Sequence, residues 1–229
     1  MNYLQYMDYL EKTYEVTLPS LYKQLAKDDM LDMQTGVPNW YQDVFPKLVQ
    51  NPPFLLVSYE YELYSPDEMI ACTKDHLPSQ DDDEGHYLKP EYENRLVMFA
   101  QCGNGDCYAF YYEHDKHSEP QIVRICHDCE SEYVAKNLQE FMVYKMLEVA
   151  LVGQDSPNIK EYLLAQLRTH SPYLTPVQIE RLNDVYQKEP VKNNHGDWVL
   201  LNNDEFDALI DELIPFDKRD ETFELYEYE

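Results

Sequence analysis

Cysteine and histidine are the side chains of this sequence best suited to chemistry, and they gather in one region. Cys102 and Cys107 flank a glycine-rich turn, while Cys126 and Cys129 have the CxxC spacing that lets two thiolates reach one metal ion. Four such thiols could form a zinc site, with His127 as a spare ligand. However, the four-residue gap between the first two cysteines is wider than the usual two, and free cysteine commonly packs as a small hydrophobe. We therefore expect no bound metal; if one did bind, its ligands would be those four cysteines.

The turn between the first two cysteines has the sequence Gly103, Asn104, Gly105, Asp106. A phosphate-binding loop would need a lysine and a hydroxyl residue after its glycines, or three spaced glycines opening a helix. Here strand-forming residues follow at once, and Asp106 would repel a phosphate. Asn-Gly in a short link favours a hairpin, because both residues tolerate positive φ. The sequence predicts that these four residues form a structural turn between two strands.

Catalytic constellations are not evident. His114 and His117 lie in a predicted loop, and adjacent residues such as Cys126 and His127 point to opposite faces of a strand, which argues against a thiolate–imidazole pair. Neither a GxSxG nor an HExxH motif occurs. The sequence therefore predicts no catalytic residue, no cofactor and a protein that is not an enzyme.

The charge balance points to a class of partner. The chain of 229 residues has 44 acidic and 18 basic side chains, for a formal net charge of -26. Such a surface repels nucleic acid and anionic lipid, whose phosphates require cations, and it attracts basic proteins by electrostatic steering. The alternative is that the acidity serves only solubility. We expect a protein partner, no nucleic acid and no membrane.

The expected location is the cytoplasm. The N-terminal stretch has no basic region followed by an apolar run, as a signal peptide would, and no stretch approaches the roughly 18 apolar residues of a membrane helix. Five cysteines, an odd count, fit reduced thiols better than a disulfide scaffold.

Hydrophobic periodicity and turn signals predict an α+β fold, with a mostly antiparallel sheet and helices from both ends of the chain packed against it. Strands are predicted at 54–65, 95–102, 107–113 and 120–126, with a further short one near Trp198. Helices are predicted at 3–14, 18–29, 65–74, 137–149, 156–170, 175–187 and around 206–213. We expect a domain over residues 1–152 and a helical C-terminal extension with an acidic tail over 153–229.

The order of several short motifs resembles the SUKH superfamily. The matching positions are Leu18-Pro19, Phe99-Ala100, Gly103, Gly105-Asp106 and the helix start from Leu138 to Met142. Asn137 stands where the family often has serine, and either residue caps a helix. The resemblance covers roughly residues 3–150, and the cysteines around the turn are not part of it. That superfamily includes bacterial toxin-immunity proteins and a fungal regulator of cell-wall synthesis.

The resemblance implies two functions. One is an immunity protein that blocks a cationic, nuclease-type bacterial toxin of the polymorphic or contact-dependent kind by direct binding. The other is a regulatory scaffold of the cell-wall signalling type. Expected partner contacts are acidic residues for steering and tyrosines for anchoring, namely Asp81, Asp82, Asp83, Glu84, Tyr108, Tyr111 and Tyr112. The competing interpretation is that these are a solvated loop and packed strand faces.

Overall fold

The computed structural model describes residues 3–75, 86–127 and 129–228. The chain separates into two compact units, and each is made of segments that are distant in sequence. Unit 1 comprises Met1–Gln24, Glu60–Leu138 and Asp217–Glu229, and unit 2 comprises Leu25–Tyr59 and Gln139–Phe216. The domain boundary predicted after residue 152 stays a prediction.

Unit 1 is built on a six-stranded antiparallel sheet with the order β1-β3-β4-β5-β6-β9. Its strands are β1 (Glu62–Leu63), β3 (Leu96–Gln101), β4 (Cys107–Tyr111), β5 (Gln121–Ile125), β6 (Ser131–Ala135) and β9 (Thr222–Phe223). The predicted strands at 95–102, 107–113 and 120–126 are thereby confirmed, whereas β6 and β9 were not predicted. The tail also forms β10 (Tyr226–Tyr228), which pairs with β2 (His86–Leu88).

The core of unit 1 is aromatic, because the central strands bury side chains on both faces. The rings of Phe99 and Phe110 stack with centroids 4.4 Å apart, and Tyr22 meets Phe110 edge-on at 5.2 Å. A register shift between Met98 and Ala100 marks a β-bulge in β3. The buried hydroxyl of Thr73 accepts a hydrogen bond from the Met98 N–H at 3.0 Å, which satisfies a backbone donor beside the bulge.

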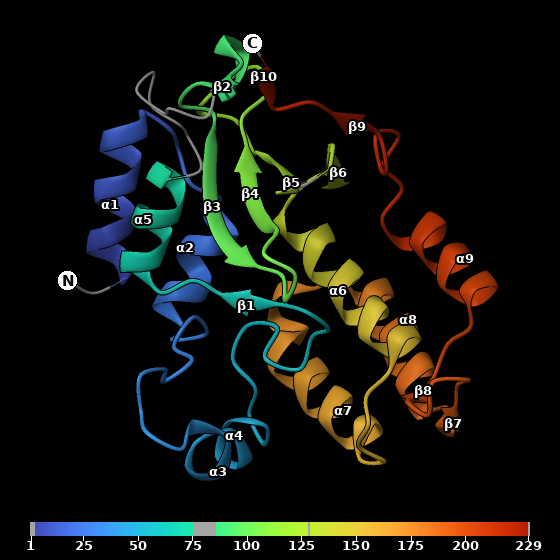
Figure 1. The fold of residues 1–229 in the computed structure, drawn as a ribbon. Helices are drawn as coiled ribbons and strands as arrows, with labels where there is room; N and C mark the ends of the chain where they lie inside the picture. The colour runs from blue at the N-terminus through green and yellow to red at the C-terminus, as the bar shows by residue number, and fades with distance from the viewer. Residues whose placement is uncertain (1–2, 76–85, 128, 229) are drawn as a thin grey trace. The chain divides into compact units, whose positions relative to one another are not determined.

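Helices cover one side of this sheet, with α5 (Pro66–Asp75) packed on β3 and α1 (Tyr3–Tyr14) packed on α5 (Figure 1). The first part of α2 (Ser20–Lys27) brings Tyr22 into the core, and η1 (Pro90–Tyr92) is a single 3₁₀ turn. At the start of α5, Ser65 and Glu68 bond each other's backbone N–H groups and so form a capping box.

Unit 2 is helical around α6 (Leu138–Val152), which is apolar and buried on nearly every side. The helices α7 (Ile159–His170), η2 (Ser171–Tyr173), α8 (Pro176–Gln187) and α9 (Asn203–Leu213) follow it, and α3 (Trp40–Asp43) and α4 (Phe45–Leu48) precede it. Capping boxes at Thr175 and Asn202 start α8 and α9. A small hairpin joins β7 (Val191–Lys192) to β8 (Trp198–Val199). The predicted helices after residue 153 are therefore confirmed.

The strand predicted at 54–65 is wrong for most of its length, since only β1 forms there. The preceding residues, 54–60, make turns, and Leu55 has a positive φ of 55°. Their backbone donors bond to buried side chains of α7 instead of a neighbouring strand. Leu55 N–H donates to His170 Nε2 at 3.0 Å, and Val57 N–H donates to Gln166 Oε1 at 2.9 Å. Tertiary hydrogen bonds thus override the β propensity of this run.

None of the helices in the described part of the chain combines the length and apolar character that crossing a bilayer requires. Together the two units give an α+β fold, as the sequence predicted.

Candidate functional site

The glycine-rich turn between β3 and β4 is a tight hairpin closed by its own side chains. Cys102 N–H donates to the Asp106 carbonyl at 2.8 Å, and Gly105 has a φ of 96°, which only glycine adopts without strain. The Asn104 side chain accepts from the Asp106 N–H at 3.1 Å and donates to the Asp106 carboxylate at 2.9 Å. Residues 103–106 therefore form a turn between β3 and β4.

Asp106 also connects this hairpin to the turn after β5. Its Oδ1 lies 2.9 Å from His127 Nδ1 and accepts the His127 backbone N–H at 3.3 Å. The Asp106 residue is only 2% exposed. Burial by itself would raise the pKa of Asp106, but the hydrogen bonds from His127 and Asn104 outweigh it and lower that pKa. Asp106 is therefore a buried, ionised carboxylate whose hydrogen bonds connect the turn between β3 and β4 with the turn after β5.

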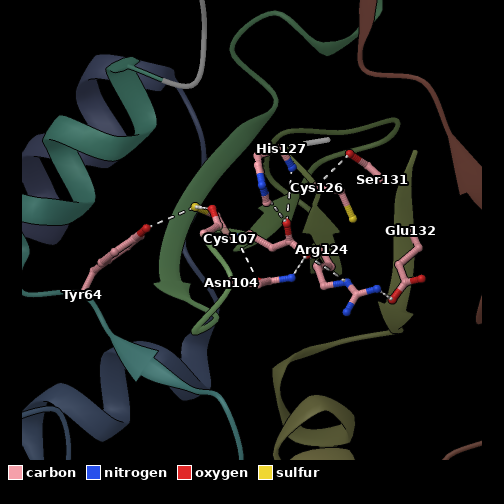
Figure 2. Close-up of polar contacts among 10 residues, drawn as sticks. Tyr64, Asn104, Cys107, Arg124, Cys126, His127, Ser131 and Glu132 are labelled. Atoms are coloured by element: carbon pink, nitrogen blue, oxygen red, sulfur yellow. Dashed lines mark hydrogen bonds and ion pairs between the residues drawn. The ribbon is translucent and has the colours of Figure 1, made fainter. Parts of the chain in front are cut away.

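Charged groups continue from this carboxylate toward the sheet edge. Arg124 Nε lies 3.8 Å from Asp106 Oδ2, and its guanidinium forms an ion pair of 3.0 Å with Glu132 on β6 (Figure 2). The side chains of His127 and Arg124 are 51% and 34% exposed, so the cluster has a buried acidic base and an accessible polar rim. Such a rim can form hydrogen bonds and ion pairs with a partner.

The cysteines near this cluster are divided between two environments. Cys107 Sγ lies 3.1 Å from the Tyr64 hydroxyl, whereas Cys126 is buried near Cys129, which is exposed. Burial raises the pKa of Cys107 and of Cys126, so both are protonated at neutral pH and neither is a ready nucleophile. Among the described residues no group of three or more histidines, cysteines and acids is arranged to hold a metal. Cys102 is buried as well.

The tyrosines expected to touch a partner are used in packing unit 1. Tyr108, Tyr111 and Tyr112 are 4%, 6% and 1% exposed. The Tyr112 hydroxyl donates to the Thr17 carbonyl at 2.9 Å, and the Tyr111 ring stacks on Phe223. Contact of these three with a partner stays a prediction. The expected acidic contacts, Asp81, Asp82, Asp83 and Glu84, lie outside the described residues.

The two loop histidines do not come together as a site. His117 Nδ1 lies 3.0 Å from the Thr17 hydroxyl, and the side chain of His114 is 85% exposed. Each therefore has its own surroundings at the surface, as the sequence predicted for solvated loop residues.

A further set of acidic residues lies on α9. Asp204, Asp207 and Asp211 are exposed and recur at spacings of three and four along α9, so they share one helix face. Their spacing in the sequence was the available signal, but only the structure shows that they are exposed while Ile210 of the same helix is buried. The burial of Asp106 was missed for a similar reason, since no local pattern marks a carboxylate as buried.

A family model describes most of this chain. The SMI1 / KNR4 family (SUKH-1) matches residues 5–143, a segment that includes the hairpin and the Asp106 cluster. No curated protein matches the sequence. Because the match spans more than half of the 229 residues, the chain belongs to the SMI1 / KNR4 family (SUKH-1).

Proposed function

We propose that this protein is a non-catalytic immunity protein that neutralises a basic bacterial toxin by binding it directly. The observation that carries the proposal is a net charge of -26 on a chain whose family members bind partner proteins. Toxins that act on nucleic acid carry cationic surfaces, because they must neutralise phosphates. An acidic inhibitor competes for that surface and is attracted to it from a distance.

The charge distribution on unit 2 supports fast association. The exposed face of α9 carries Asp204, Asp207 and Asp211, and the helix itself contains no lysine or arginine. Electrostatic steering can raise association rates from about 10⁵–10⁶ to 10⁸–10⁹ M⁻¹s⁻¹ at low salt. The raised pKa values of Cys107 and Cys126 support a role without nucleophilic chemistry.

The first test is protection of cells. The protein is co-expressed with toxins encoded by genes next to its own, and colony survival is scored. Survival with one neighbouring toxin, together with a stable complex of the two purified proteins, is the expected result. Failure to protect against every neighbouring toxin, with no complex formed, would refute the proposal.

The second test isolates the electrostatic part. Association with the toxin, followed by stopped-flow fluorescence, should slow at least tenfold between about 20 and 500 mM salt. The double variant Asp207→Asn, Asp211→Asn should associate several-fold more slowly at low salt, while the charge-preserving Asp207→Glu, Asp211→Glu should match the wild type. Equal rates for all three proteins would show that the α9 face does not steer the toxin.

A further inference from the structure

Unit 2 contains an open groove that the family relationship does not explain. The groove is lined by residues 151–155, 191–195 and 199–203, with Phe45, Tyr59, Asp197 and Glu205, and its volume is about 1180 Å³. We call it the α9 groove, since the N-terminal end of α9 forms part of it. Most of its lining lies beyond residue 143, where the family match ends. Its volume exceeds the 300–1,000 Å³ typical of small-molecule pockets and suits a segment of a protein.

Apolar side chains are exposed along this groove. Val191 and Tyr59, which line it, are 60% and 38% exposed, and the 75% exposed ring of Tyr41 packs against the lining residue Phe45 with centroids 6.3 Å apart. Trp40 packs on the same two rings. Exposed aromatic residues beside a concavity are the usual anchor sites of protein interfaces, because they bury a large area with little loss of side-chain entropy.

The groove is also acidic. Three of its described lining residues are carboxylates, namely Asp155, Asp197 and Glu205, against one lysine, Lys192. Glu205 forms an ion pair of 2.7 Å with Lys188, so the acidic groups that can attract a partner are Asp155 and Asp197. The ammonium group of Lys192 lies 5.1 Å from the centroid of the Trp198 ring, so it is held over that ring. The charge of the lining therefore favours a segment that carries lysine or arginine.

The backbone around the groove is fixed before any partner arrives. Gly153 has a φ of 87°, and a Cβ on it would lie 2.5 Å from the Trp198 carbonyl oxygen. Gln154 and Trp198 exchange backbone hydrogen bonds of 3.2 and 2.7 Å. The Asn193 side chain accepts from the N–H groups of His195 and Asp197 at 2.9 and 3.0 Å, which shapes the turn of the hairpin. A preorganised groove loses less entropy on binding.

The edge of β7 is not suited to pairing with a strand of the partner. Trp198 uses its backbone groups to bond Gln154, so those of its cross-strand partner Lys192 face away from β8. That outer edge presents a lysine at 192 and a proline at 190, two residues that discourage strand addition. A partner therefore contacts the groove through side chains.

We propose that the α9 groove binds an exposed segment of the partner protein that carries lysine or arginine together with an aromatic or leucine anchor. The nature of the partner rests on the proposed function, whereas the chemistry of the segment follows from the groove. Cations of the segment meet Asp155 and Asp197, and the anchor packs between Val191 and the aromatic rings.

The test does not require the toxin. Random dodecapeptides displayed on phage are selected on the full-length protein, and enriched sequences are synthesised and measured by fluorescence anisotropy at 150 mM salt, where the Debye length is about 8 Å. We expect enrichment of peptides that combine two or more lysines or arginines with an aromatic residue or leucine. Val191→Arg should weaken their binding at least tenfold, because it removes an apolar contact and adds a like charge.

Matched variants outside the groove are the controls. Val177 on α8 is 55% exposed and does not line the groove, so Val177→Arg should bind within twofold of the wild type. Likewise Asp155→Lys should weaken binding at least fivefold, whereas Asp211→Lys on α9 should have little effect at this salt concentration. Circular dichroism of the variants checks that each is folded.

Several results would overturn the inference: no enrichment, enrichment of acidic peptides, or equal affinity for Val191→Arg and Val177→Arg. A wild-type dimer in sedimentation that Val191→Arg abolishes would assign the groove to a second copy of the chain instead. If the protein fails to protect cells from the toxin but binds the peptides normally, the proposed function is refuted and the proposal that the α9 groove binds a basic segment is retained. Full protection of cells by the Val191→Arg variant would show that the groove does not contribute to toxin binding.

Discussion

The buried histidine of unit 2 makes the stability of that unit depend on pH between 8 and 5. His170 is 0% exposed, its Nε2 accepts the Leu55 N–H, and its Nδ1 lies 2.8 Å from the Gln166 carbonyl oxygen. This pattern places the proton on Nδ1 and keeps the ring neutral. A second proton would have to sit on Nε2, against the N–H that it now accepts.

Burial, the larger cause, lowers the pKa of His170 from 6.5 to about 4, although the hydrogen bond to Gln166 opposes it. Between those values the unfolded chain binds the proton and the folded chain does not, so stability falls as the pH drops through 6.5 and levels off near 4. Each pKa unit corresponds to about 1.4 kcal/mol, so His170 reduces the free energy of unfolding by about 2 kcal/mol between pH 8 and pH 5. Most carboxylates titrate below this range.

Urea unfolding followed by tryptophan fluorescence measures this effect where it arises. Both tryptophans, Trp40 and Trp198, belong to unit 2, as does His170. The wild type should lose about 2 kcal/mol between pH 8 and pH 5, and His170→Gln should lose clearly less over the same range, whatever its stability at pH 8. His195→Gln, an exposed control, should retain the wild-type slope. If His170→Gln and the wild type fall in parallel, the reasoning from the buried neutral ring is wrong.

Two further substitutions test the turns. Asp106→Asn replaces the buried carboxylate that accepts the His127 bonds and should lower the free energy of unfolding in urea by about 1–3 kcal/mol. The control Asp207→Asn, on the exposed face of α9, should change that free energy by less than about 0.5 kcal/mol. Equal effects of the two substitutions would show that the Asp106 cluster does not stabilise the fold. Gly153→Ala places a Cβ 2.5 Å from a backbone carbonyl oxygen of β8. This substitution should lower the midpoint of thermal unfolding more than Gly196→Ala does, because Gly196 also has a positive φ but no atom within 4 Å of the added Cβ. The reverse order in calorimetry would contradict the predicted clash.

Local sequence patterns predicted the elements that are stabilised by interactions between neighbouring residues. The hairpin at 103–106 follows from Asn-Gly chemistry, and α5 follows from a capping box and a proline in its first turn. The strand predicted at 54–65 is wrong for most of its length. Its β propensity is genuine, but its backbone N–H groups donate to His170 and Gln166, more than 100 residues away in the sequence. No window of the sequence contains that information.

Four features could be predicted from the order of the residues: the acidic character, the hairpin, the family and most of the helices. Composition, turn chemistry and 3.6-residue periodicity are properties of the chain alone. Three other features appear only in the folded chain: the burial of Asp106 against His127, the pairing of β9 with β6, and the groove lined by residues 151–155, 191–195 and 199–203. Each of these features depends on contacts between segments that are distant in the sequence, because those contacts determine which side chains are buried and which hydrogen bonds they form.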